Sequence, residues 1–218
     1  MSEVLFKLNE LTVRYGNEPP VLRNLSMDLV KGSRIGLVGR NGSGKSTLLS
    51  ALVGLMDDFD GELWAFGKWR RDDSDFAEVR RRAGLLFEDP DDQLFNITVS
   101  EDVAFGPFNL GWPRERVITA VRDTLARLDL SGYEERITYR LSTGEKRMVS
   151  IATVLAMDPE VLLLDEPTAG LDHRHTRLLE EILKQSSKTL LVVSHDRDFL
   201  ASVTNQTIQL ENGQAVYL

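Results

Sequence analysis

A run of nine residues with the composition of a phosphate-binding loop lies in the first quarter of the chain. It fits the pattern G-x-x-x-x-G-K-[S/T] and comprises Gly39, Arg40, Asn41, Gly42, Ser43, Gly44, Lys45, Ser46 and Thr47. Backbone N–H groups of such a loop, and of the helix after it, bind phosphates because their unpaired donors and the helix dipole favour an anion. Lys45 then reaches the β- and γ-phosphates, and the Ser46 hydroxyl holds Mg²⁺. The run predicts a nucleoside triphosphate site.

The segments on either side of this loop have the patterns that the chemistry requires. Ile35 to Val38 is a short apolar run typical of a buried strand, and Leu48, Leu49 and Leu52 follow at helical spacing. A glycine-rich turn that binds nothing is the alternative. The strand-loop-helix order favours the phosphate site.

Three further side chains follow apolar runs that resemble buried strands. Asp165 and Glu166 come after Val161 to Leu164, and His195 comes after Thr189 to Val193. Ligands bind at the carboxyl ends of the strands in an open parallel sheet. We expect Asp165 to bind Mg²⁺ and Glu166 to polarise the water that attacks the γ-phosphate. The alternatives are a helix-capping role for Glu166 and a structural role for His195.

Composition excludes several classes of protein. The 218 residues are 42% hydrophobic, and 26 basic against 34 acidic residues give a net charge of −8, which opposes nonspecific binding to nucleic acid or anionic lipid. The absence of cysteine excludes disulfides and thiolate metal sites. No apolar run is long enough to span a membrane, so we expect no direct membrane insertion.

The order of the segments predicts one α/β domain, residues 1–218. Residues 1–34 form an antiparallel layer in this interpretation, with Tyr15 ending a strand. A helical subdomain occupies about residues 89–157, inserted into a core of 1–88 and 158–218. Its helices begin near Pro113 and at Ser142, where Ser142 and Glu145 form a capping box.

Two charged segments between the loop and this subdomain are interpreted as surface features. Asp72 to Asp75 is typical of a loop. The arginines at 70–71 and 80–82 have acidic neighbours, so a solvated face is favoured over a nucleic-acid site.

With these segments in this order, the chain resembles the ATPase subunits of ATP-binding-cassette (ABC) transporters along nearly its whole length. The resemblance implies a P-loop NTPase fold with a mostly parallel central sheet, ATP and Mg²⁺ as cofactors, and a second ATPase chain of the same or a different kind. It implies that Tyr15 stacks on adenine, that the Glu88 segment links the γ-phosphate and Mg²⁺ to the membrane partner, and that His195 senses the γ-phosphate. It also implies that Asp172 lies in a loop across the dimer interface. The family's signature motif, which closes over the ATP of the second chain, matches Leu141, Ser142, Thr143, Gly144 and Glu145.

Within the family, Asp89 to Phe95 and Glu101 to Pro107 resemble the energy-coupling-factor group, which imports cobalt, nickel, biotin and other vitamins. Transmembrane subunits are then the partners, and the chain is peripheral at the cytoplasmic face of the cell membrane. Partners in this group present arginine-bearing coupling helices, so Asp91 or Asp92 is expected to receive such an arginine. A polar turn, rather than a metal site, is the interpretation of the histidines at 173 and 175.

Two residues depart from the family pattern and keep alternatives open. Glu88 stands where Gln is usual and adds negative charge beside the triphosphate, and Thr143 stands where Gly is usual and restricts close approach of the backbone to a phosphate. A degenerate regulatory cassette with slow turnover is therefore one alternative. A soluble ABC ATPase, not attached to a transporter, is the other.

Overall fold

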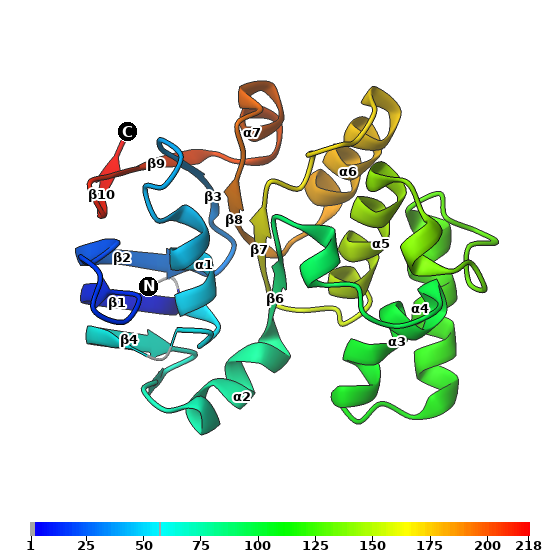
Figure 1. Cartoon of the computed structure of the whole chain (residues 1–218), viewed down its shortest axis with the longest axis horizontal. Helices are drawn as coiled ribbons and strands as arrows, with labels where there is room; N and C mark the ends of the chain where they lie inside the picture. The colour runs from blue at the N-terminus through cyan, green and yellow to red at the C-terminus, as the bar shows by residue number, and fades with distance from the viewer. Residues whose placement is uncertain (1–2, 57) are drawn as a thin grey trace.

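The chain folds around two β-sheets, shown in Figure 1. The computed structural model describes residues 3–56 and 58–218. A four-stranded sheet of order β2-β1-β4-β5 forms the N-terminal layer, and its pairs are antiparallel. Its strands are β1 (Val4–Val13), β2 (Leu22–Val30), β4 (Phe59–Ala65) and β5 (Lys68–Trp69). The predicted antiparallel layer is thus completed by a segment that follows the phosphate-binding loop.

A six-stranded sheet of order β10-β9-β3-β8-β7-β6 forms the centre of the molecule. All its pairs are parallel except β9 with β10 at one edge, which confirms the predicted mostly parallel sheet. The strands are β3 (Arg34–Val38), β6 (Ala83–Leu86), β7 (Val161–Asp165), β8 (Thr189–Val193), β9 (Gln206–Glu211) and β10 (Gln214–Tyr217). Because β3, β8 and β7 are neighbours, the segments that follow them meet at one edge of the sheet.

Both faces of the central sheet are buried, which explains the continuous apolar runs of its strands. Along β7, Val161 and Leu163 belong to one hydrophobic core, whereas Leu162 and Leu164 belong to the other. The first core also contains side chains from the four-stranded sheet, α1 (Lys45–Leu52) and α2 (Asp73–Arg82). Side chains of α6 (His173–Gln185) and α7 (Arg197–Val203) lie in the second core.

Three helices and two short 3₁₀ turns occupy residues 90–155. The helices are α3 (Val99–Asn109), α4 (Arg114–Arg127) and α5 (Thr143–Leu155), and the turns are η1 (Pro90–Asp92) and η2 (Thr138–Arg140). Figure 1 shows the three helices together on one side of the central sheet, with α5 between the sheet and the other two. In this region α3 was not predicted, and Pro113 caps α4 one residue before the helix begins.

One expectation for residues 70–82 is wrong, and another fails at a single arginine. Asp72 to Asp75 is not a loop: Asp72 caps α2, and Asp75 completes a capping box, because carboxylates accept the unpaired N–H groups of a helix start. Arg70 is not solvated. Its guanidinium is buried and donates to the carbonyls of Ala65 and Asp75 and to the Glu78 carboxylate.

One strand end also differs from its prediction. Strand β1 ends at Val13, and Tyr15 lies in the bend that follows it. No helix within residues 3–56 and 58–218 has the length and apolar character needed to cross a lipid bilayer.

The Asp102 carboxylate fixes the loops that lead to the start of α5. It is buried and accepts hydrogen bonds from the backbone N–H groups of Phe95 (3.1 Å) and Asn96 (2.9 Å) and from the Thr138 hydroxyl (3.0 Å). Thr138 opens the turn that ends at Arg140, immediately before Leu141.

We expect Asp102→Ala to lower the free energy of unfolding by about 2 to 4 kcal/mol, because it leaves buried donors without an acceptor. Chemical denaturation monitored by circular dichroism measures this. Asp123→Ala, which removes an exposed carboxylate paired with its neighbour Arg122, is the matched control and should change stability by less than about 0.5 kcal/mol. Equal denaturation midpoints for the two variants would contradict this role of Asp102.

Candidate nucleotide site

The phosphate-binding loop connects β3 to α1 and ends in a helix start that has no side-chain cap. Gly44 is the N-cap of α1 with φ +100°, a backbone conformation that favours glycine. A Cβ at this position would lie 2.8 Å from the Leu22 side chain, so the close packing also requires glycine. The Lys45 ammonium bonds back to the carbonyls of Gly39 and Arg40, each at 3.1 Å. These two hydrogen bonds tie the first residues of the loop to the lysine at its end.

Glu166 and His195 face each other from the ends of neighbouring strands. The turn after β7 holds Glu166 at φ +45°, a region that non-glycine residues rarely adopt. Its carboxylate accepts from the His195 N–H at 3.2 Å and from the Ser194 hydroxyl at 3.3 Å. The His195 imidazole Nε2 lies 3.6 Å from the other carboxylate oxygen, which is buried and has no hydrogen bond among the described residues. Glu166 does not cap a helix, so the alternative role proposed for it is wrong.

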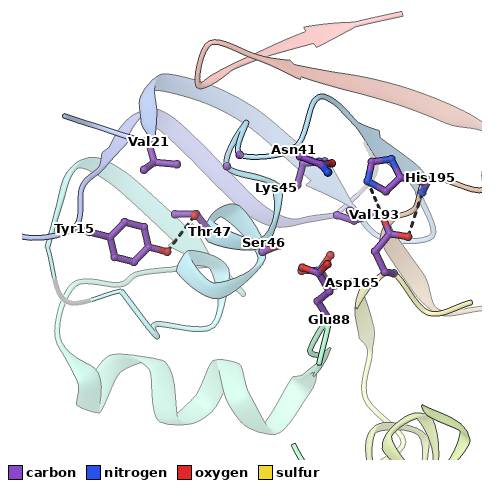
Figure 2. Close-up of a pocket in the computed structure, with 13 residues that line it drawn as sticks. Tyr15, Val21, Asn41, Lys45, Ser46, Thr47, Glu88, Asp165, Val193 and His195 are labelled. Carbon is purple, nitrogen blue, oxygen red and sulfur yellow. Dashed lines mark hydrogen bonds and ion pairs between the residues drawn. The ribbon is translucent and has the colours of Figure 1, made fainter. Parts of the chain in front are cut away.

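These groups open onto one cavity of about 560 Å³, shown in Figure 2. It contains side chains from the loop, from both strand ends and from the bend after β1. Its lining residues are Tyr15, Val21, Asn41, Gly42, Gly44, Lys45, Ser46, Thr47, Glu88, Asp165, Glu166, Val193 and His195. Of the residues predicted for the nucleotide within this chain, only Gly39, Arg40 and Ser43 are missing from that lining, and Arg40 and Ser43 line an adjacent cleft.

Oxygen groups suited to a magnesium ion gather on one side of the cavity. In Figure 2 Glu88 and Asp165 lie together below Ser46. Burial raises the pKa of Asp165, the Ser46 hydroxyl opposes this by hydrogen bonding, and the carboxylates of Glu88 and Glu166 raise that pKa further. Carboxylates and a hydroxyl are the hard ligands that Mg²⁺ prefers. Ser46, Asp165 and Glu88 fit a magnesium site, where the ion would neutralise charge on the phosphates.

Tyr15 lies at the opposite end of the cavity from these carboxylates. Its side chain is 51% exposed, and its hydroxyl is 3.1 Å from the Thr47 hydroxyl. A tyrosine ring packed into the core would be buried, so Tyr15 is not a core residue. The exposed ring is free to stack on a base.

The predicted signature residues are absent from this lining and lie at the start of α5, where Thr143 lines an adjacent cavity that also contains Ser46, Glu88 and Asp165. Ser142 caps the helix, and its capping box with Glu145 is present as predicted. The Glu145 carboxylate also accepts from the Tyr133 hydroxyl (2.8 Å) and Arg136 (3.1 Å), and the backbone N–H of Ser142 lowers its pKa most. Glu145 is fully engaged within the chain and fixes the helix start. Leu141 packs into the second core.

The loop that contains Gly170 lies against this helix start. A Cβ at Gly144 would be 2.8 Å from the Gly170 carbonyl oxygen, so the two backbones approach closely. Asp172 is the N-cap of α6, and its carboxylate accepts from the His175 N–H at 2.8 Å.

Arg147 and Gln93 were not predicted as functional residues, although both contact the segment that leads to Glu88. Arg147 donates to the carbonyls of Phe87 and Glu88, and Gln93 accepts from the Phe87 N–H at 3.1 Å. The sequence carries one signal for Arg147: it is a charged residue adjacent to Met148 on the apolar face of a helix.

The site has the elements of a P-loop ATPase, and comparison with known proteins identifies its family. The ABC transporter family model matches residues 22–169. The chain is 39% identical to the energy-coupling factor transporter ATP-binding protein EcfA of Methanothermobacter thermautotrophicus, over 97% of this chain and 70% of EcfA. This chain belongs to the ABC transporter ATP-binding family, as its sequence predicts, and it is an ATPase that uses ATP with Mg²⁺.

Solved structures agree with this assignment. CbiO1 of Clostridium perfringens, part of the ABC transporter complex CbiONQ, has a TM-score of 0.82 at 32% identity, covering 98% of this chain and 87% of CbiO1. The ATP-binding cassette MJ0796, a dimer bound to ADP and phosphate, has a TM-score of 0.86 at 25% identity, covering 97% and 96%. The fold class is confirmed.

Proposed function

We propose that the chain is the ATP-binding and hydrolysing subunit of an energy-coupling-factor importer for cobalt, nickel or a vitamin such as biotin. The observation that carries the ATPase assignment is the placement of Lys45, Asp165 and Glu166 around one cavity. The transporter group is supported by the identity to EcfA and by the likeness to CbiO1. The cargo classes follow from the resemblance of Asp89 to Phe95 to this group. The chain is then peripheral at the cytoplasmic face of the membrane.

In the proposed mechanism the residues of the cavity divide the work of ATP hydrolysis. The loop and Lys45 bind the phosphates, and Tyr15 stacks on adenine. Glu166 polarises the attacking water, since its buried free oxygen is a ready acceptor for a water proton. His195, hydrogen-bonded through its backbone to Glu166, contacts the γ-phosphate. Bound Mg²⁺ neutralises phosphate charge.

We propose that the start of α5 completes the site of a second cassette chain. Ser142, Thr143 and Gly144 do not line this chain's cavity, yet they form a helix start, which favours an anion. The Asp172 loop then lies across the interface between the chains. The dimer of MJ0796 is consistent with this arrangement.

A second groove, of about 340 Å³, is the proposed contact with a membrane subunit. It lies between the core and α3, and Phe95 and Phe105 stack edge to face at its rim, both largely exposed. Its acidic groups are Asp92 and Asp102, and the Asp102 carboxylate is occupied by backbone N–H groups. The Asp92 carboxylate has no hydrogen-bonded or ionic partner in the described part of the chain, although the Asp92 backbone N–H donates to the Asp89 carbonyl. Asp91, by contrast, pairs with Lys146 at 2.5 Å. Of the two candidates, Asp92 is therefore the acceptor for a partner arginine.

A regulatory cassette with slow turnover is the second candidate function. It is favoured by the Glu88 carboxylate beside Asp165, which raises the pKa of Asp165, and by Thr143 at the helix start. A regulatory cassette would hydrolyse ATP more slowly than the transporter subunit proposed first. If the chain purified from its native host carries no membrane proteins with it, a soluble ABC ATPase is favoured instead.

Replacing the proposed water-polarising group tests the hydrolytic function. We expect Glu166→Gln to lower Mg²⁺-dependent phosphate release at least about a hundredfold while ATP still binds, because general base contributions are of this size. Phosphate release and equilibrium binding of ATP are the two measurements. Glu181→Gln, on α6 and outside the cavity, is the matched control. Slow release by the parent chain, equal to that of Glu166→Gln, would favour the regulatory cassette.

The partner groove is tested by comparing the two adjacent aspartates. We expect Asp92→Asn to reduce retention of the membrane subunit from the native host at least about threefold, because it removes the charge that faces the arginine. Asp91→Asn should have a smaller effect, since Asp91 already pairs within the chain. Affinity purification in detergent, with quantification of the co-purified membrane subunit, measures both. Equal retention by Asp92→Asn and the parent would refute the assignment.

A further inference from the structure

Two side chains, those of Arg147 and Gln93, fix the backbone of Phe87 and Glu88 to α5. Arg147 on α5 donates one N–H to the Phe87 carbonyl at 2.7 Å and another to the Glu88 carbonyl. Gln93 accepts from the Phe87 N–H and donates to the Ser150 carbonyl (3.0 Å) and the Thr153 hydroxyl (2.6 Å). Strand β6 ends at Leu86, so these bonds begin where the ladder of the sheet stops. The Glu88 segment is therefore held by α5.

Arg147 is an unusual residue for a purely structural role. Only 2% of it is exposed, and within residues 3–56 and 58–218 no carboxylate lies within ion-pair distance of it. Its Nε is buried with no hydrogen-bond acceptor among the described residues. Burying an unpaired charge is costly, and an apolar side chain would fill a helix face at lower cost. The hydrogen bonds of this guanidinium go to the carbonyls of Phe87 and Glu88.

The Glu88 carboxylate has no side-chain anchor of its own. It lines the cavity beside Asp165 and Ser46, and among the described residues it has neither a hydrogen bond nor an ion pair that fixes it. Its position is set by its backbone, and that backbone is bonded to Arg147. A substitution of Arg147 should consequently displace the Glu88 carboxylate at the magnesium side of the cavity.

We infer that Arg147 is a positioning residue that holds the Glu88 carboxylate at the magnesium side of the ATP site. It acts through the Phe87 and Glu88 carbonyls, and Gln93 shares the task through the Phe87 N–H. Because Arg147 and the cap Ser142 lie on the same helix, the Glu88 carboxylate and the start of α5 move as one unit. This inference rests on the proposed function, in that Glu88 faces the Mg²⁺ of bound ATP.

Binding of Mn²⁺, which takes the same oxygen ligands as Mg²⁺, tests the inference. The chain carrying Glu166→Gln is saturated with ATP, and bound Mn²⁺ is measured by electron paramagnetic resonance. We expect Arg147→Lys, which keeps the charge but loses the two-pronged donor, to raise the half-saturating Mn²⁺ concentration at least about threefold. Lys146→Met, the neighbouring cation that pairs with Asp91, is the control and should cause no shift.

A double-mutant cycle separates positioning from general loss of structure. In a Glu88→Ala background the effect of Arg147→Lys on Mn²⁺ binding should disappear, because there is no carboxylate left to position. An Arg147→Lys effect that persists in this background, or a lowered melting temperature with unchanged Mn²⁺ binding, would overturn the inference. If Arg147→Lys does not fold, Gln93→Met in the same cycle gives the same two outcomes. Failure of the proposed function would be recognised separately, as absence of ATP binding by the Glu166→Gln chain, and would overturn both.

Discussion

The structure depends on one constraint, which is that the backbone between β3 and α1 must present bare N–H groups to an anion. A side chain at Gly44 would overlap the packed Leu22, and Lys45 must fold back on the loop carbonyls. The loop can hold this conformation because β3 lies in the interior of the central sheet, between β8 and β9. The same sheet brings Asp165 and His195 to the loop, since β8 and β7 follow β3 in the strand order. The proposed roles of Asp165, Glu166 and His195 thus fall to residues at or directly after the ends of buried strands.

The parts of the fold that could be predicted are those whose sequence pattern has one structural explanation. Four apolar residues before Asp165 and four before Ser194 required strands buried on both faces, and the alternation of β7 between two cores shows why. The capping box at Ser142 was equally direct. Helix α3 was missed because few of its residues are buried, namely Val99, Asp102, Val103 and Pro107, and two of these are not apolar side chains of the usual helical stripe. Asp72 was misjudged because a helix cap and a turn use the same residue types.

The residues of the candidate site also fall into those that the sequence predicts and those that it does not. Residues that act through a sequence-local motif, from Gly39 to Thr47, could be placed from the sequence, and so could the acids at strand ends. Arg147 could not, because the bonds it makes are to a segment about sixty residues away, and arginine on a helix is ordinarily solvated. Arg70 was misjudged for a different reason: its partners Ala65, Asp75 and Glu78 are close in sequence, but acidic neighbours of an arginine are ordinarily typical of a solvated face. A single sequence can show that such an arginine stands on the apolar face of a helix, as Arg147 does, but it does not show which carbonyls the side chain bonds.

In the proposed function this chain supplies half of each ATP site. Its own cavity holds the phosphate-binding loop, the proposed magnesium ligands and Glu166, whereas Ser142 and Gly144 at the start of α5 are absent from its lining and are proposed to serve a second chain. Two variants, each defective in one half, test this directly when mixed in equal amounts: Glu166→Gln and Ser142→Arg. We expect that neither variant hydrolyses ATP alone and that the mixture recovers about a quarter of the parent rate, because half of the random dimers contain one intact site of two. A mixture no more active than the separate variants, under conditions where the parent hydrolyses ATP, would contradict it.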